Sequence, residues 1–258
     1  MEITYEEQGP LAHVRLNRPE KRNALTRAML EHLAELFAGL DARTDLRAVI
    51  LGGAGQDFCA GTDINELKAL DVADARAVAE RGQKVCDVVE LCRVPVIAAV
   101  QGRAAGGGCE LALACHLRVA AADASFSLPE LRLGVIPGYG GTQRLARAAG
   151  QGRALAAMLA GDGLGADEAL RRGVVNRVAA AAGDAVDEAE SLAHQIIDTA
   201  APLAVRACLE AVTRGARLPL AEGLALEAEL FARLFSTDDV REGTSAFLEK
   251  RKPSFRGQ

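Results

Sequence analysis

The stretch GRAAGGGCELALAC at residues 102–115 constrains the fold of this chain more than any other. Three glycines at 106–108 run straight into Leu111–Ala114, which suits a buried helix, and they follow the apolar run PVIAAV at 95–100. A continuous apolar run of this kind is typical of a strand buried on both faces. Consecutive glycines start helices poorly, and the lone carboxylate of Glu110 is costly to bury as an anion. A junction that carries both costs indicates a role beyond packing.

The rest of the chain divides into an α/β part and a helical part. Short apolar runs alternate with helical periodicity up to about residue 142, and one helix is predicted from its N-cap Thr26 onward. A second helix is predicted across the seventies and eighties. Short helices punctuated by glycine follow residue 142, and from about residue 184 the pattern is helical, broken at Pro202 and Pro219. The predicted strands are 11–16, 47–51, 95–100, 116–121 and 174–178.

Composition and charge argue against several classes of function. The 258 residues carry a formal net charge of −5 with both signs interspersed, and only 3% are aromatic. We therefore expect no nucleic-acid partner, because the basic stripe and the stacking platforms that such binding needs are missing. We also expect no signal peptide, no membrane-spanning run and a cytoplasmic location. The six cysteines and four histidines are scattered, which predicts reduced thiols and no metal site.

Three glycine-rich junctions, at 52–55, 102–108 and 138–141, raise the question of a nucleotide site. The dinucleotide fingerprint Gly-x-Gly-x-x-Gly fails at each of them, because a residue other than glycine holds its last position. No Gly-Lys-Ser/Thr follows any junction, and no Gly-x-Ser-x-Gly elbow occurs. These patterns exclude the nicotinamide, ATP and serine-hydrolase motifs.

Glycine at these junctions can instead let a ligand approach the backbone. Helix N-termini present free N–H groups and the positive end of the helix dipole. Two such groups aimed at one point form an oxyanion hole, in which each donor stabilises a transition state by roughly 3–4 kcal/mol. GGGCEL at 106–111 can supply one donor, and FCAGTDI at 58–64, a glycine turn after a strand, can supply the other.

Five segments of the chain resemble, in order, the motifs of the crotonase (enoyl-CoA hydratase/isomerase) family. The resemblance covers essentially the whole chain and implies an α/β fold with a ββα spiral core and a C-terminal helical oligomerisation region. It also implies a CoA thioester substrate, with no separate cofactor. We expect the core at 1–198 and the oligomerisation region at 199–258. The five segments are NRPEKRNALT (17–26), FCAGTDINEL (58–67), GRAAGGGCELALAC (102–115), FSLPELRLGVIPGYGGTQRL (126–145) and FLEKRKPSF (247–255).

The resemblance implies which backbone groups bind the thioester. By position, the oxyanion donors are the N–H groups of Thr62 and Gly107, and the thioester oxygen docks at Gly107. The family more often has alanine at position 62, so we expect the hydroxyl of Thr62 to narrow or polarise the nearby pocket without removing the donor. Gly138 matches the position beside the bound water.

Contacts with CoA are implied in the same way. The turn around Thr62 would meet adenine and pantetheine through main-chain groups, and two basic residues near the N-terminus are candidate contacts, although they could equally be a solvated pair. Two residues near the C-terminus would reach the ligand of a neighbouring subunit. The expected contacts are Ala60, Gly61, Asp63 and Ile64, then Lys21 and Arg22, then Lys252 and Phe255.

Two carboxylates complete the predicted site. Glu110 follows Gly107 by three residues, and Glu130 in SLPEL matches the position of the family's second acid, after Pro129. Adding water across a 2,3-double bond requires a proton to leave the water and a proton to reach C2. Two nearby carboxyls in a dry pocket cannot both ionise cheaply, so they act as a coupled base and acid. We assign Glu110 to activate the water and Glu130 to supply the C2 proton; the reverse division of roles is the alternative.

The sequence predicts a lyase, a 2-enoyl-CoA hydratase of acyl-CoA catabolism. One alternative is another CoA-thioester reaction on the same scaffold, either double-bond isomerisation or hydration in aromatic or branched-chain catabolism. A second alternative is a non-catalytic or RNA-binding protein of this fold, which the two glutamates and the net charge of −5 disfavour. We expect Cys109 to be a packing residue and Asp63 to be a turn residue rather than a base.

The C-terminal helices predict an assembly of subunits. Seven apolar residues occupy more than one stripe of a helix, which is too many for the surface helix of a monomer. With the resemblance, this excess predicts a homotrimer or homohexamer. The acyl tail is expected to lie along residues 65–90 and 131–139. The seven residues are Leu220, Leu224, Leu226, Leu230, Phe231, Leu234 and Phe235.

Overall fold

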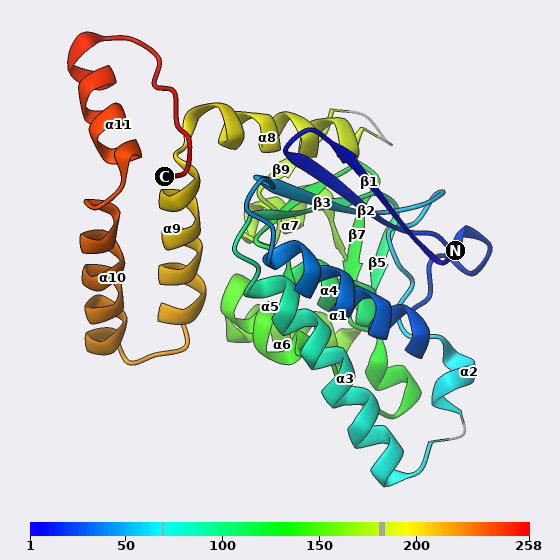
Figure 1. Ribbon diagram of the computed structural model, residues 1–258. Coiled ribbons are helices and arrows are strands. Elements are labelled where there is room, and N and C mark those ends of the chain that lie inside the picture. The colour runs from blue at the N-terminus through cyan, green and yellow to red at the C-terminus, as the bar shows by residue number, and fades with distance from the viewer. Residues whose placement is uncertain (69, 181–183) are drawn as a thin grey trace.

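A six-stranded sheet lies at the centre of the fold, and the last helices of the chain extend away from it (Figure 1). The computed structural model describes residues 1–68, 70–180 and 184–258. In the six-stranded sheet the described strands have the order β1-β2-β3-β4-β6-β9, and within this sheet only the β1–β2 pair is antiparallel. A second sheet has the order β5-β7-β8. The strands are β1 (Ile3–Gln8), β2 (Leu11–Leu16), β3 (Ala48–Gly53), β4 (Val96–Val100), β5 (Arg103–Ala105), β6 (Leu117–Ala120), β7 (Ser125–Ser127), β8 (Leu164–Gly165) and β9 (Arg177–Val178).

Both faces of the large sheet are covered, which explains why its central strands are apolar throughout. Every residue of β3 and β4 is buried. One face contributes to the main core with α1, α3 and α4, and the other packs against α8 through Ala185, Ala189 and Ala193. Parallel strands in this setting need continuous apolar runs. These helices are α1 (Arg27–Asp41), α3 (Val72–Glu90), α4 (Gly107–Ala114) and α8 (Ala185–Thr199).

In two successive units the chain passes from the large sheet to the second sheet before it forms a helix. β4 leads to β5 and then α4, and β6 leads to β7 and then to the 3-10 helix η2 and α5. A bridge between Cys59 and Ala104 continues the second layer beside β5. This repeated order is the predicted ββα spiral. It brings the junctions of successive units together, and the Gly106 N–H donates to the Ser127 carbonyl at 2.9 Å. The remaining core elements are η1 (Pro19–Lys21), α2 (Ile64–Leu67), η2 (Glu130–Leu133), α5 (Gly141–Ala149), α6 (Gln151–Ala160) and α7 (Ala166–Arg171).

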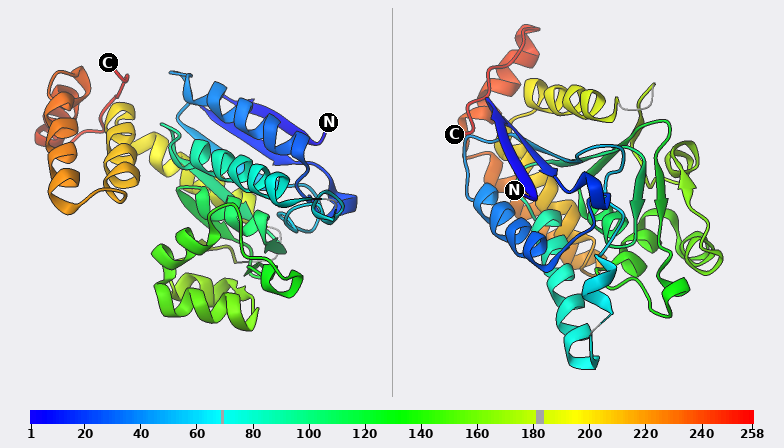
Figure 2. Two further views of the ribbon diagram at one scale, coloured as in Figure 1. Left: turned by 90° about the horizontal axis from the view of Figure 1, so that it is seen from below. Right: turned by 90° about the vertical axis from the view of Figure 1, so that its right-hand side faces the viewer.

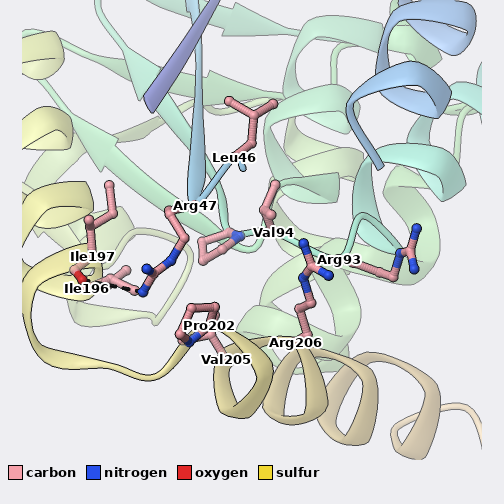
Figure 3. A pocket seen from close by; sticks show the side chains of 10 residues that line it. Leu46, Arg47, Arg93, Val94, Ile196, Ile197, Pro202, Val205 and Arg206 are labelled. Atoms are coloured by element: carbon pink, nitrogen blue, oxygen red, sulfur yellow. Dashed lines mark hydrogen bonds between the residues drawn. The ribbon is translucent and has the colours of Figure 1, made fainter. Parts of the chain in front are cut away.

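Helices α9 (Pro202–Gly215), α10 (Leu220–Leu234) and α11 (Asp238–Glu249) form an arm that projects from the core (Figure 2). Two arginines hold the elbow between α8 and α9, around a small cavity of about 10 Å³ (Figure 3). Arg47 donates to the Ala200 carbonyl at 2.7 Å, and Arg206 donates to the Arg43 carbonyl at 3.1 Å. These bonds fix the direction in which the arm leaves the core.

The arm leaves an apolar surface exposed and fastens the end of the chain. On α10, Leu220 is 78% and Phe231 63% exposed, whereas Leu230 is buried. The carboxylate of Asp239 accepts the N–H groups of Arg256 and Gly257, at 2.7 and 2.8 Å, which holds the C-terminal segment against α11. Whether another subunit covers the apolar surface stays a prediction, as does the division of the chain at residues 198 and 199.

Several elements differ from the sequence expectations. The predicted strand 174–178 shrinks to the two residues of β9, because the N–H groups of Val174 and Val175 bond to the Ala169 carbonyl and end α7. The N-cap of α1 is confirmed, since the Thr26 hydroxyl accepts the Met29 N–H at 3.2 Å. Strands β1, β5, β7 and β8 were not predicted. No helix within the described ranges is both long and apolar enough to span a membrane.

Candidate active site

The turn before α2 and the start of α4 lie against each other. Leu25 and Thr62 form a parallel bridge, in which the Leu25 N–H donates to the Gly61 carbonyl at 2.7 Å. Gly61 has φ +109°, and a Cβ there would lie 3.0 Å from the Ala105 carbonyl oxygen and 3.6 Å from the Gly107 nitrogen. Only glycine combines this backbone conformation with so close an approach. The turn is therefore built to bring the amide of Thr62 beside that of Gly107.

Both of these amides are available to a ligand. Among the hydrogen bonds of residues 1–68, 70–180 and 184–258, none has the N–H of Thr62 or Gly107 as donor. Gly107 is the first residue of α4, where the helix leaves its N–H groups without carbonyl partners. Gly106 before it has φ +50°, which a residue with a side chain rarely adopts. The structure thus brings together the two predicted oxyanion donors.

Glu110 belongs to α4, and its buried carboxylate lies against the first residue of α5. Glu110 is only 1% exposed, and its Oε1 accepts the N–H groups of Tyr139 (2.8 Å) and Gly141 (2.7 Å). Burial raises the pKa of Glu110 above its ordinary value, while these N–H groups act in the opposite direction. A helix N-terminus favours an anion, so the contacts stabilise Glu110 as a carboxylate.

Glu130 has a different environment. It begins η2, and both of its carboxylate oxygens are buried without a hydrogen-bond partner in the described part of the chain. A Cβ on Gly106 would lie 3.2 Å from its Oε1, which places the carboxyl group at the mouth of α4. Burial, with a further contribution from the charge of Glu110, raises the pKa of Glu130 from 4.5 to about 7. Glu130 is therefore partly protonated near neutral pH, as a proton donor at that pH must be.

The raised pKa of Glu130 predicts a change in stability with pH. The folded protein binds this proton more tightly than the unfolded chain, so its stabilising effect is complete below pH 4.5 and is lost as the pH rises to about 7. Glu130→Gln should remove this loss. We expect the free energy of unfolding of the variant, relative to the wild type, to be higher at pH 8 than at pH 4.5, measured by urea unfolding. An equal difference at the two pH values would contradict a buried, uncompensated carboxyl group.

Tyr139 connects the two halves of the site, and the sequence predicts it only along the acyl tail, without its contacts to Glu110 and Thr62. Its N–H donates to Glu110, and the Thr62 hydroxyl lies 2.9 Å from its phenol oxygen. Gly141, the other donor to Glu110, was also missed. A Cβ on Gly141 would lie 2.8 Å from Glu110 Cγ, so only glycine lets α5 start there. The GYGG junction was visible in the sequence, but its contact with Glu110 depends on the packing of α5 against α4.

Gly138 and Asp63 contact residues other than the two glutamates. Gly138 presents its carbonyl to Gln83 Nε2 at 2.9 Å. Asp63 is a turn residue as expected, because Oδ1 caps α2 at Asn65 and Oδ2 lies 3.1 Å from Arg18 Nη2. The CoA contacts proposed for Ala60, Gly61, Asp63 and Ile64 stay predictions.

The predicted basic and C-terminal contacts lie on two separate elements. Lys21 and Arg22 are exposed at η1. The turn at residues 60–64 contacts this segment, because the Ala60 N–H donates to the Arg22 carbonyl at 2.9 Å. Lys252 and Phe255 lie on the arm, where the Phe255 ring packs beside Gly243 of α11. Within this chain they are therefore not assembled with the glutamates, and their predicted contact requires a neighbouring subunit.

Two thiols lie beside the site. Cys109 and Cys59 are both buried, and burial raises the pKa of the Cys59 thiol to about 12 and also raises that of Cys109. A thiol must lose its proton to act as a nucleophile. Both side chains are therefore packing residues, as expected for Cys109.

Known proteins are similar to this chain over nearly all of its length. A family model described as "Enoyl-CoA hydratase/isomerase" matches residues 6–258. The "Short-chain-enoyl-CoA hydratase" of Clostridium acetobutylicum is 40% identical, over 97% of this chain and 95% of that protein. The "(E)-benzylidenesuccinyl-CoA hydratase" of Thauera aromatica is 39% identical over the full length of both. The crystal structure of an enoyl-CoA hydratase from Bacillus anthracis superposes with a TM-score of 0.94 at 36% identity and covers both chains completely. The chain belongs to the enoyl-CoA hydratase/isomerase (crotonase) family.

Proposed function

We propose that this protein is an enoyl-CoA hydratase, which adds water reversibly across the 2,3-double bond of a 2-enoyl-CoA thioester. The observation that carries the proposal is the unequal environment of two buried carboxyl groups beside two free amides. Glu110 accepts two N–H groups, which favour its carboxylate form, whereas Glu130 accepts none within the described part of the chain and its pKa is raised to about 7. A hydratase needs one group of each kind.

The chemistry follows from these environments. The thioester oxygen accepts the N–H groups of Thr62 and Gly107, which stabilise the negative charge that develops on it as water attacks C3. Glu110 takes a proton from the attacking water, and its hydrogen bonds to Tyr139 and Gly141 hold the carboxylate in place. Glu130 delivers its proton to C2 as the enolate collapses. The reverse reaction exchanges the two roles.

The proposal is tested by incubating the purified protein with crotonyl-CoA and following the absorbance of the enoyl thioester. A loss of absorbance with formation of 3-hydroxybutyryl-CoA is the expected result. Conversion of a 3-enoyl-CoA to the 2-enoyl isomer, without hydration, would instead identify an isomerase. No turnover of either thioester would favour the non-catalytic alternative.

The state of ionisation of the two glutamates predicts the pH profile. With Glu130 as acid, kcat/KM for crotonyl-CoA should fall as the pH rises above about 7, because Glu130 loses its proton. It should also fall in acid, where Glu110 becomes protonated. Initial rates measured from pH 5 to 9 provide the test. A profile that stays flat above pH 7 would contradict Glu130 as the proton donor.

We also propose that the arm assembles a homotrimer or homohexamer. The apolar face of α10 stands exposed on one chain, and burying it would make each folded subunit depend on its neighbours. Light scattering coupled to size-exclusion chromatography should give three or six times the 27.0 kDa chain mass. An active monomer at micromolar concentration would contradict the proposal.

A further inference from the structure

The side chain of Tyr139 is seated beside the proposed oxyanion hole. The residue is only 4% exposed. A Cβ on Gly107 would lie 2.9 Å from its Cε2, so the ring covers the first residue of α4. Its hydroxyl lies 2.9 Å from Thr62 Oγ1. The ring therefore contacts both residues whose amides are free, while the backbone of the same tyrosine holds Glu110.

A glycine in the middle of α3 makes room for this ring. A Cβ on Gly82 would lie 2.0–2.3 Å from three ring atoms of Tyr139, which no packing arrangement tolerates. Glycine weakens a helix interior because it loses more backbone freedom than other residues. Gly82 lies well inside the helix and is buried, so contact with the ring is the feature that accounts for it. The position of the ring is therefore built into the fold.

The hydroxyl of Thr62 supports the same position. A buried phenol needs a hydrogen-bond partner, and Thr62 provides one. The hydroxyl group on residue 62 thus acts on Tyr139, while its amide remains free for the thioester oxygen. Gly82, Thr62 and Gly107 enclose the ring from three elements: α3, the turn before α2 and the start of α4.

The ring lies on the buried side of the site, and the turn before α2 lies on its exposed side. The turn at residues 60–64 leads outward to Ile64, which is 55% exposed, and offers the path for CoA. Tyr139 lies on the inner side, between α3 and α4, where its backbone contacts Glu110. With the thioester oxygen at the amides of Thr62 and Gly107, as in the proposed function, acyl carbons beyond the double bond would extend toward this ring.

We propose that Tyr139 determines the acyl-chain length of the substrate, because its ring closes the pocket just beyond the reacting double bond. The enzyme then accepts short, unbranched 2-enoyl groups and rejects long ones. This inference rests on the proposed function for the placement of the thioester. In a pocket of fixed depth, kcat/KM differs by about 10–200-fold between two substrates for each methylene that does not fit.

The test compares wild type with Tyr139→Ala, which opens the pocket, and Tyr139→Phe, which keeps the ring. Dissociation constants of butyryl-CoA and decanoyl-CoA are measured by calorimetry, and kcat/KM is measured for crotonyl-CoA and 2-decenoyl-CoA. We expect wild type and Tyr139→Phe to favour the short thioesters by at least about tenfold. In Tyr139→Ala the preference should fall by at least about tenfold. Thermal unfolding confirms the folded state, and Tyr139→Leu replaces the alanine variant if that variant does not fold.

Three results would overturn the inference. The wild type could bind decanoyl-CoA as tightly as butyryl-CoA, the folded alanine or leucine variant could keep the wild-type preference, or Tyr139→Phe could lose the preference as fully as Tyr139→Ala. The saturated thioesters cannot be hydrated, so their binding separates this inference from the proposed function. A binding preference that shifts as expected in a protein without hydratase activity supports the pocket wall and refutes only the reaction.

Discussion

Replacing either Glu110 or Glu130 by glutamine is expected to lower kcat for crotonyl-CoA hydration by about 10²–10⁴-fold. An amide keeps the size of the side chain and part of its hydrogen bonding but cannot accept and return a proton. Binding of saturated butyryl-CoA should stay within about threefold of the wild type, because the loss concerns the transition state. Steady-state kinetics and calorimetry measure the two quantities separately.

The two variants have a matched control on the surface. Glu35 on α1 is exposed, and Glu35→Gln makes the same chemical change away from the site. It should leave kcat and the dissociation constant of butyryl-CoA unchanged. Near wild-type hydration by Glu110→Gln or Glu130→Gln would show that the residue is not an essential acid or base.

Gly107→Pro is expected to reduce kcat by at least about 10²–10³-fold, because it removes one of the two oxyanion donors. Proline is tolerated at the first position of a helix, and Gly107 is the first residue of α4. Proline also places a Cβ 2.9 Å from the Tyr139 ring, as alanine would, so the effect of the missing N–H is the difference between the proline and alanine variants. Circular dichroism and steady-state kinetics on the same preparation relate the loss to the folded protein.

Two further variants separate the backbone from the side chains. Gly107→Ala keeps the N–H but crowds the Tyr139 ring, 2.9 Å from the new Cβ, so its loss should be smaller than that of proline. Thr62→Ala keeps the other N–H and should be mild with crotonyl-CoA. A folded but inactive Thr62→Ala protein would assign the role to the hydroxyl instead of the amide.

The sequence predicted those features that local pattern determines. The apolar run at 95–100 became β4, buried on both faces, and the glycines at 106–108 lead into α4, whose residues are all buried. Such features follow from continuous hydrophobicity and from the backbone freedom of glycine. The resemblance to a family supplied the further prediction of which residues in these segments contact the thioester.

The missed features depend on contacts between distant residues. Strands β5, β7 and β8 are two or three residues long and exist only through pairings such as Ala104 with Phe126, so no periodicity marks them. Strand β1 is largely polar, because it lies at the sheet edge. The Tyr139 ring packs against Gly82, which lies 57 positions away in the chain. The sequence around either residue alone does not indicate this contact.

The most direct test of the account follows both atoms that the reaction adds. Crotonyl-CoA is incubated with the protein in deuterated water enriched in ¹⁸O, and the product is analysed by mass spectrometry and NMR at early times. If Glu110 activates water and Glu130 protonates C2, the product is 3-hydroxybutyryl-CoA with ¹⁸O on C3 and a single deuterium on C2. Deuterium in the thioester without ¹⁸O on C3 would contradict hydration and show that the two carboxyl groups only move protons.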